Sequence, residues 1–158
     1  MVILTTSLVQ CLQARDSAIW AASSTAHHQT DIVRLSGIKV EPDRQQLVLY
    51  VPELFSVPFL NNLVVNPAIS LLFASVYTYL SYQIKGNYLQ HWPCTAGEIA
   101  NQLEYLDMFT DVMIEVGLPK EKFYQAYAHQ PSIAIRMQAE EVFEQTPRKG
   151  TGEKIFMV

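Results

Sequence analysis

The chain has 158 residues, a length that suits one domain with a single hydrophobic core and needs no disulfide or structural metal. Hydrophobic residues make up 49% of it and charged residues only 16%, a balance typical of proteins that bury part of their surface in an oligomer. The net charge of −4, without any basic cluster, argues against nucleic acid or anionic membranes as main partners.

The two cysteines, Cys11 and Cys94, have neither metal-ligand nor redox spacing, so we interpret them as idle thiols of a cytoplasmic protein. Residues 1–16 lack the basic leader, apolar core and cleavage site of a signal peptide, and none is expected. No apolar run approaches the roughly 20 residues that a membrane span requires.

The first part of the chain reads mainly as strands. Leucines recur every four residues near the start and predict an amphipathic helix over residues 3–14. The segments that follow are rich in β-branched and small side chains, and they predict strands at residues 17–25, 30–40 and 45–51. His27 and His28 occupy the first turn. Because no further ligand stands at metal-binding spacing, we interpret them as exposed turn residues.

The middle of the chain changes its period. A helix is expected to begin near Pro58 and to end before Pro67, since the leucines and valines between them follow helical spacing. Residues 68–75 then form an almost unbroken apolar run, whereas residues 80–90 mix apolar and polar side chains. This order predicts a buried strand followed by a more solvent-exposed one.

The last part of the chain returns to helices before it ends in a strand. A capping-box spacing begins at Thr95, and the helix after it is expected to end at Gly117. A second helix of about ten residues is predicted after Pro119. Alternating apolar and polar residues from Ser132 predict a half-buried strand that rejoins the sheet. The tail from residue 146 is polar and is predicted to be mobile.

These elements predict a mainly β fold in a single domain over residues 1–158. Six strands, mostly connected as hairpins, describe a closed or nearly closed antiparallel barrel with peripheral helices. A doubly wound sheet requires strands and helices to alternate along the chain, and they do not. A helical bundle cannot accommodate the β-rich first ninety or so residues.

The order of elements and several segments together resemble the pyridoxamine 5'-phosphate oxidase-like superfamily, the FMN-binding split barrels. The resemblance covers nearly the whole chain. It is carried by IVRLSGIKV at 32–40, LVLYV at 47–51, NNLVVNPAISLLF at 61–73, YTYLSYQIKG at 77–86 and VFEQTPRKGTGE at 142–153. It implies a six-stranded split barrel that forms a homodimer, with two FMN sites at the interface, each built from both chains.

The resemblance also implies cofactor contacts at Arg34, Ser36, Gly37, Lys39, Tyr50, Val51, Ser81, Gln83 and Lys85. Arg34 and Lys39 match a family arginine and lysine five residues apart that approach the phosphate and the flavin ring. Gln83 and Lys85 match the Q-x-K-G pattern of the broader group. Two simpler interpretations stay open: the first pair as outward residues of an exposed strand, and the second as a polar face buried in the dimer.

Several residues depart from the family pattern where it grips the phosphate. Val57, Pro58 and Phe59 stand where Ser-Arg-Lys or a similar run precedes the central helix, and Leu80 replaces an arginine. Charge-assisted phosphate contacts each contribute about 1.5–3 kcal/mol, so the loss of two predicts FMN binding weaker by about two to four orders of magnitude.

The sequence therefore leaves two hypotheses for function. The first is an FMN-binding oxidoreductase that acts on a small-molecule substrate, in which the flavin carries the chemistry and no catalytic side chain is required. The second is a non-catalytic dimeric split-barrel protein with a degenerate flavin site, which holds another ligand such as haem, or none. No catalytic triad order, phosphate-cradling glycine loop or zinc spacing supports a hydrolase or a nucleotide triphosphatase.

Overall fold

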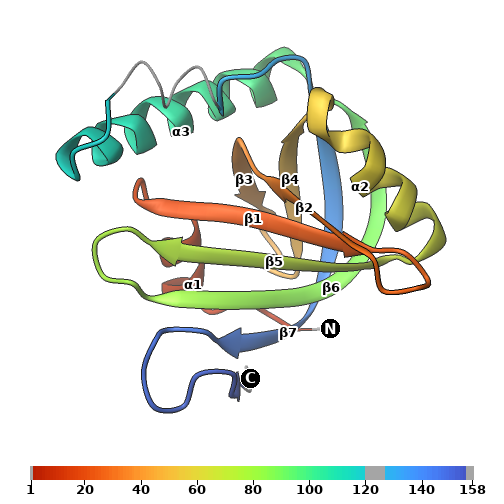
Figure 1. Ribbon diagram of the computed structural model, residues 1–158, viewed down its shortest axis with the longest axis horizontal. Coiled ribbons are helices and arrows are strands. Elements are labelled where there is room, and N and C mark those ends of the chain that lie inside the picture. The colour runs from red at the N-terminus through yellow and green to blue at the C-terminus, as the bar shows by residue number, and fades with distance from the viewer. Residues whose placement is uncertain (1, 120–126, 156–158) are drawn as a thin grey trace.

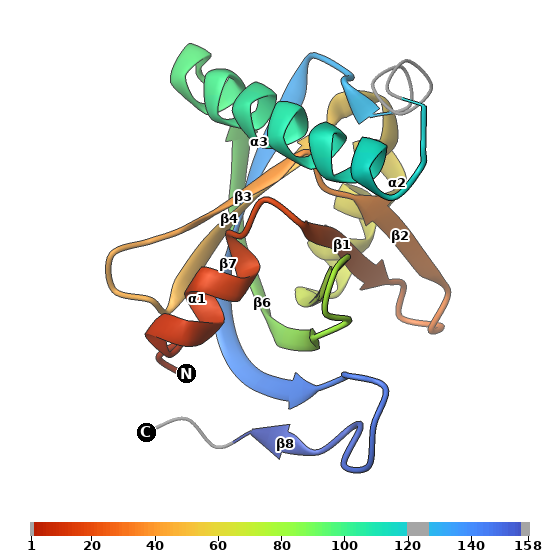
Figure 2. The same ribbon diagram turned by 90° about the vertical axis from the view of Figure 1, so that its left-hand side faces the viewer.

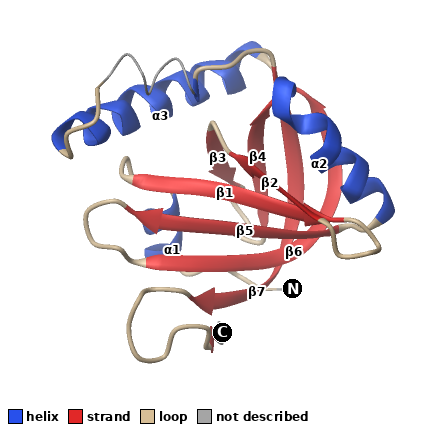
Figure 3. Cartoon of the chain, viewed as in Figure 1, coloured by secondary structure: helices blue, strands red, loops and turns tan. Residues whose placement is uncertain are grey.

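The computed structural model describes residues 2–119 and 127–155. Its helices are α1 (Thr6–Leu12), α2 (Glu53–Val65) and α3 (Ala96–Glu115). Its strands are β1 (Ser17–Ser24), β2 (Thr30–Arg34), β3 (Gly37–Val40), β4 (Gln46–Pro52), β5 (Ala68–Ser75), β6 (Ser81–Pro93), β7 (Ser132–Glu144) and β8 (Lys154–Ile155). The mainly β class is confirmed (Figure 3). Within the described residues, no helix is both long and apolar enough to cross a membrane.

All the strands belong to one curled antiparallel sheet with the order β2-β1-β5-β6-β7-β4-β3, and β8 pairs with β7. The sheet curls into a half-barrel, so that β1 and β5 lie across from β4 and β7 (Figure 1). The predicted count of six strands is corrected to eight within residues 2–119 and 127–155. One added strand is β8, and the other arises because the predicted strand at residues 30–40 is interrupted.

That interruption lies at Leu35 and Ser36, which join the two ends of the sheet. The Leu35 amide donates to the carbonyl of Ile19 in β1, at 3.0 Å. The next amide, that of Ser36, donates to the carbonyl of Tyr50 in β4, at 2.9 Å. Two adjacent residues are therefore bound to opposite ends of the sheet, and the chain has to leave β2 before it can pair as β3. We call residues 35–36 the linker.

The main core lies inside the curled sheet. Alternate residues of β4 point inward, and Leu47, Leu49 and Val51 have no exposed surface. Leu8 and Leu12 of α1 join the same buried cluster as these strand residues. Since a half-barrel leaves its ends open, α1 and α2 provide the apolar side chains that cover them.

Helix α2 starts five residues earlier than the sequence predicts, at Glu53 rather than at Pro58. Pro52 precedes it, and a proline there costs little because the first amides of a helix need no intrahelical acceptor. Pro58 lies inside the helix and removes one amide that would bond four residues back. Burial of Phe59 and Leu63, with 0% and 1% exposure, offsets that loss.

Helix α3 confirms the predicted capping box at Thr95 and crosses above β1 (Figures 1 and 2). Phe109, Val112 and Met113 form a second apolar cluster with Ala18 of β1. The helix predicted after Pro119 falls mostly on residues 120–126, which lie outside the described residues.

The polar tail folds back on the sheet (Figure 2). A turn after residue 146 leads into β8, which pairs with Val142 and Phe143 of β7. The Glu144 amide donates to the Glu153 carbonyl at 3.0 Å. The tail predicted to be mobile thus has a hydrogen-bonded position as far as Ile155.

Candidate functional site

The candidate site is a cavity of about 450 Å³ beside β2 and the linker. This volume falls within the range of roughly 300–1,000 Å³ that is usual for small-molecule sites. Its walls come from β2, the linker, the start of α2 and Tyr127. They comprise Asp31, Ile32, Val33, Arg34, Leu35, Ser36, Pro52, Leu54, Phe55, Pro58, Phe59 and Tyr127. Two of the residues implied by the family resemblance, Arg34 and Ser36, therefore line one cavity.

The guanidinium of Arg34 lies among aromatic rings. Its central carbon is 5.2 Å from the ring centroid of Trp20, 4.8 Å from that of Phe109 and 4.2 Å from that of Tyr127. Burial raises the pKa of neighbouring Tyr105 to about 12, an effect that the charge of Arg34 opposes. Attraction between a cation and these ring faces holds Arg34 against α3 and away from bulk water.

The hydroxyl of Ser36 is buried and already donates within the chain. It lies 2.8 Å from Oε1 of Gln102 and 3.2 Å from the carbonyl of Tyr50. Gly37 follows it, and a Cβ added there would come within 3.3 Å of Cδ2 of Tyr50. The glycine thus lets β3 approach the tyrosine ring closely.

Tyr50 and Val51, the pair predicted on the next strand, point to opposite faces of the sheet. Tyr50 packs with Val48 and Ala134 on the outer face, and burial raises its pKa to about 12. Val51 has 0% exposure and lies in the main core. Its side chain is therefore closed off from any ligand, and only its backbone could take part in binding.

Lys39 lies on the outer face of β3 and belongs to an ion-pair network. Its ammonium is 3.0 Å from the carboxylate of Glu41, and the same carboxylate is 3.2 Å from the guanidinium of Arg136. Arg136 in turn lies over the ring of Trp92, at 5.1 Å. The exposed Lys39 is thus neutralised within its own chain.

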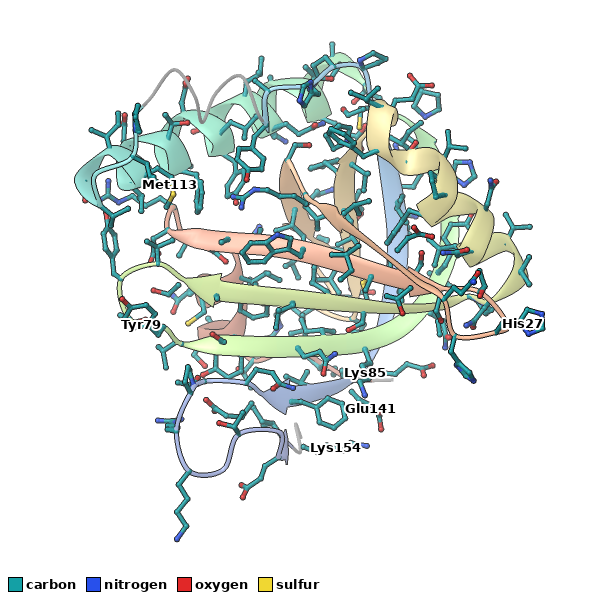
Figure 4. The ribbon with its side chains drawn as sticks, in the orientation of Figure 1. His27, Tyr79, Lys85, Met113, Glu141 and Lys154 are labelled. Carbon is teal, nitrogen blue, oxygen red and sulfur yellow. The ribbon has the colours of Figure 1, made fainter. Side chains whose placement is uncertain are left out.

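The remaining predicted residues, Ser81, Gln83 and Lys85, lie on the outer face of β6, apart from the cavity. Nε2 of Gln83 donates to the Ser70 hydroxyl at 2.8 Å, and Ser70 is the cross-strand partner of Lys85. The Lys85 ammonium lies 4.6 Å above the ring of Phe143 and near Glu141 (Figure 4).

A groove of about 260 Å³ runs along this outer face. Its lining includes Ser24, Thr30, Ser70, Lys85 and the close-packed Gly86. We call this surface the hydroxyl groove. Sequence reasoning missed its serines and threonine, and it also missed the apolar rim of the cavity. For the groove, a signal existed in the serines of two paired strands, Ser23 and Ser24 in β1 and Ser70 in β5.

The four departures from the family pattern lie in different environments. Val57 is 60% exposed on α2, Pro58 lines the cavity, and Phe59 is buried in the core while also forming part of the cavity wall. Leu80 lies in the turn before β6 and lines a separate cavity of about 490 Å³ beside α1. None of the predicted site residues lines that second cavity.

The cavity fits one part of FMN and not the other. Its apolar and aromatic walls suit the flat isoalloxazine ring. A phosphate dianion requires cations and free donors, yet Arg34 is the single basic side chain among the described lining residues. The carboxylate of Asp31 lies in the same wall. The residues present therefore fit the ring and do not fit the phosphate.

The described residues contain no group of three or more histidine, cysteine or acidic side chains that could hold a metal. His27 and His28 lie in the exposed turn between β1 and β2, as predicted. Burial raises the pKa of the Cys94 thiol, which keeps it protonated and unreactive at neutral pH.

No protein-family model and no curated protein matches the chain. Solved structures do. HupZ of Group A Streptococcus is 15% identical with a TM-score of 0.53, and the match covers 96% of this chain and 99% of that one. A Lactobacillus delbrueckii protein, provisionally assigned as a pyridoxamine 5'-phosphate oxidase, is 13% identical with a TM-score of 0.54, over 89% and 93%.

An FMN-binding protein from Syntrophomonas wolfei is 7% identical with a TM-score of 0.51, over 84% of this chain and 80% of that one. At such low identity these matches establish the fold alone. The resemblance seen in the sequence is confirmed at this level: the chain has the split-barrel fold of pyridoxamine 5'-phosphate oxidase-like, FMN-binding proteins.

Proposed function

We propose that this protein binds a flavin-type cofactor, FMN in the form that the sequence resemblance implies, and acts as an oxidoreductase on a small-molecule substrate. The observation that carries the proposal is the cavity beside the linker. It brings together Arg34 and Ser36, two positions implied by the family resemblance, with a wall of flat and apolar side chains. Solved proteins of the same fold include one described as FMN-binding.

We further propose that the working form is a homodimer. The chain carries its predicted cofactor residues in separate places: Arg34 and Ser36 at the cavity, Gly37, Lys39 and Tyr50 at a pocket of about 200 Å³ beside β3 and α3, and Ser81, Gln83 and Lys85 on β6. A second copy could bring these groups together. Large apolar side chains on the outer face support this assembly, since Ile32 is 68% exposed and Leu72 is 40% exposed. A cytoplasmic location stays a prediction.

The first experiment is a titration of the cofactor-stripped protein with flavin, followed by quenching of flavin fluorescence. The proposal expects saturable binding with one flavin per chain. Phe55, 46% exposed, lines the cavity, so Phe55→Ala should weaken binding about tenfold by removing apolar contact. Leu89 is equally exposed on β6, and Leu89→Ala should leave binding unchanged. Equal effects of the two variants would contradict a flavin site in this cavity.

Redox activity needs a separate measurement. The flavin-loaded protein should be reduced anaerobically and then mixed with oxygen or with a panel of small electron acceptors. Reoxidation faster than that of free reduced flavin would support an oxidoreductase. Reoxidation no faster than free flavin with every acceptor would leave a flavin-binding protein without the proposed activity.

One observation favours a second candidate, a non-catalytic binding protein with a degenerate flavin site. Arg34 is surrounded by aromatic rings and Lys39 is paired with Glu41, so two predicted cofactor cations are engaged within the chain. This candidate expects colourless purified protein and no saturable flavin binding. The cavity would then hold another flat ligand, such as haem, or none.

A further inference from the structure

Two serine hydroxyls in or near the cavity wall donate their hydrogen bonds within the chain. Ser36 donates to Gln102 and to the Tyr50 carbonyl, as described above. Ser56, in the second half-turn of α2, donates to the carbonyl of Glu53 at 2.9 Å. Neither hydroxyl has a proton left for a ligand.

The backbone at the start of α2 offers little more to an anion. The Glu53 amide donates to the Pro131 carbonyl at 2.9 Å, and Pro58 has no amide hydrogen. Glu53 also places a carboxylate in the first turn, where it opposes the attraction of a second negative charge to the helix terminus.

The charges in the wall nearly cancel. Arg34 contributes one positive charge and Asp31 one negative charge, and Nδ2 of Asn62 lies 2.6 Å from the Asp31 carboxylate and holds it in place. A terminal phosphate carries close to two negative charges at neutral pH, and in this wall it would meet no surplus of positive charge. A ring without a charged terminus meets no such cost.

Most other basic side chains of the described residues form ion pairs within the chain. These pairs limit the positive charge that a second copy could contribute to the cavity. Carboxylates pair with Arg15, Lys39, Arg136, Arg148 and Lys154. Apart from Arg34, the other described basic residues, Arg44, Lys85 and Lys149, form no ion pair; Arg44 bonds to the Thr6 hydroxyl and Lys85 lies above a ring on the outer face of β6. Five of the basic side chains that a second copy would carry are therefore already neutralised within their own chain.

From these observations we infer that the cavity recognises a flavin by its ring and does not bind a terminal phosphate. Riboflavin and FMN should therefore bind with similar affinity. The inference rests on the proposed flavin binding and sharpens its ligand class. It makes ring shape, rather than phosphate charge, the basis of selection at this site.

The test is a pair of titrations of the whole cofactor-stripped protein, one with FMN and one with riboflavin, at low and high salt. We expect the two dissociation constants to agree within about threefold and to change little with salt, because no charge pair with the ligand is screened. FMN binding at least about thirtyfold tighter than riboflavin binding, with marked loss in salt, would overturn the inference and leave the proposed function standing.

A charge placed at the cavity rim supplies the matched variant. Leu54 lines the cavity and is 71% exposed, so Leu54→Arg should improve FMN binding about tenfold and leave riboflavin binding unchanged. Val64 lies on the same helix away from the cavity and is 74% exposed, so Val64→Arg should change neither. A Leu54→Arg protein with no gain for FMN would contradict a phosphate position at this rim.

Two further outcomes distinguish the proposed flavin binding from the inference about the phosphate. If neither riboflavin nor FMN binds saturably to a folded protein, the proposed function fails and the inference fails with it. If riboflavin binds and FMN does not, the proposed flavin class stands and exclusion of the phosphate is stronger than inferred.

Discussion

The cavity beside the linker and the hydroxyl groove on β6 differ in the polar groups that each offers to a ligand. The cavity has flat apolar walls, and its cation lies among aromatic rings. The groove has small apolar residues and Ile69 in its wall, together with serine and threonine hydroxyls and the exposed ammonium of Lys85, but it has no aromatic ring among its described lining residues. Features that a single phosphorylated ring ligand needs together are thus held apart on one chain. A shared fold alone is a poor guide to a ligand, because ring-binding walls and phosphate-binding polar groups can be retained separately.

The largest expected effect concerns Gly86, where the groove meets the sheet. A Cβ at this position would lie 1.9 Å from the backbone oxygen of Gln138, which cannot move without breaking the pairing of β6 with β7. We expect Gly86→Ala to reduce the free energy of unfolding by about 3 kcal/mol or more, measured by urea denaturation.

Gly97, in the first turn of α3, supplies the control for that variant. A Cβ there would meet nothing within 4 Å, so Gly97→Ala should stabilise the protein by up to about 1 kcal/mol. If Gly86→Ala leaves the free energy of unfolding unchanged, the backbone at the groove wall can shift, and the groove is not fixed by the pairing of β6 with β7.

The two cations provide the next test. Arg34→Met keeps an unbranched side chain among the rings but removes the charge, and we expect it to cost about 2 kcal/mol of unfolding free energy. Lys85→Met on the exposed face should cost little. Circular dichroism in urea gives both values without depending on Trp20, which contacts Arg34. Equal costs would mean that the rings contribute nothing to the retention of Arg34.

The tyrosines beneath α3 predict how stability depends on pH. The unfolded chain releases a tyrosine proton near pH 10, whereas Tyr50 and Tyr105 hold theirs until about pH 12. The stabilising effect is therefore complete below pH 10, and the free energy of unfolding should fall between pH 10 and 12 by about 1.4 kcal/mol per pH unit for each tyrosine. Denaturation at stepped pH measures the slope. Tyr105→Phe should make it shallower, and an unchanged slope would contradict the burial of that hydroxyl.

The smallest expected effect separates a structural serine from a ligand-binding one. Ser36→Ala removes a buried hydroxyl with two acceptors and should cost about 1–2 kcal/mol of unfolding free energy. Flavin affinity should stay the same, because the hydroxyl donates into the chain. Ser81→Ala, which removes an exposed hydrogen bond to the Tyr79 carbonyl, is the control and should cost less. A drop in flavin affinity without a loss of stability would reverse the assignment of Ser36.

Local signals in the sequence predicted the elements that depend on local chemistry. The capping box at Thr95 and the hairpin at His27 were both confirmed, since each depends on residues that are close in the chain. The break at residues 35–36 could not be predicted, because it is imposed by strands β1 and β4 at opposite ends of the sheet. The start of α2 before Pro58 likewise depends on tertiary burial, which overrides the local preference of proline.

The sequence predicted where some site residues lie but not which side chains surround them. The resemblance pointed to Arg34 correctly as a residue at a cavity. The residues next to Arg34 in the sequence do not predict that Trp20, Phe109 and Tyr127 surround its guanidinium, because these rings come from distant segments. Predicting charge availability requires the three-dimensional neighbours of each cation, and a motif does not contain them.

The linker carries one more consequence, for the mechanics of the protein. Two residues can span at most about 7 Å of extended chain, and both linker amides are tied to neighbouring strands. The split in the barrel therefore has a maximum width set by covalent geometry. We expect the inner edge of the cavity to keep its dimensions whether or not a ligand or a second copy is bound, so that adjustment to a guest falls to the side chains of α2.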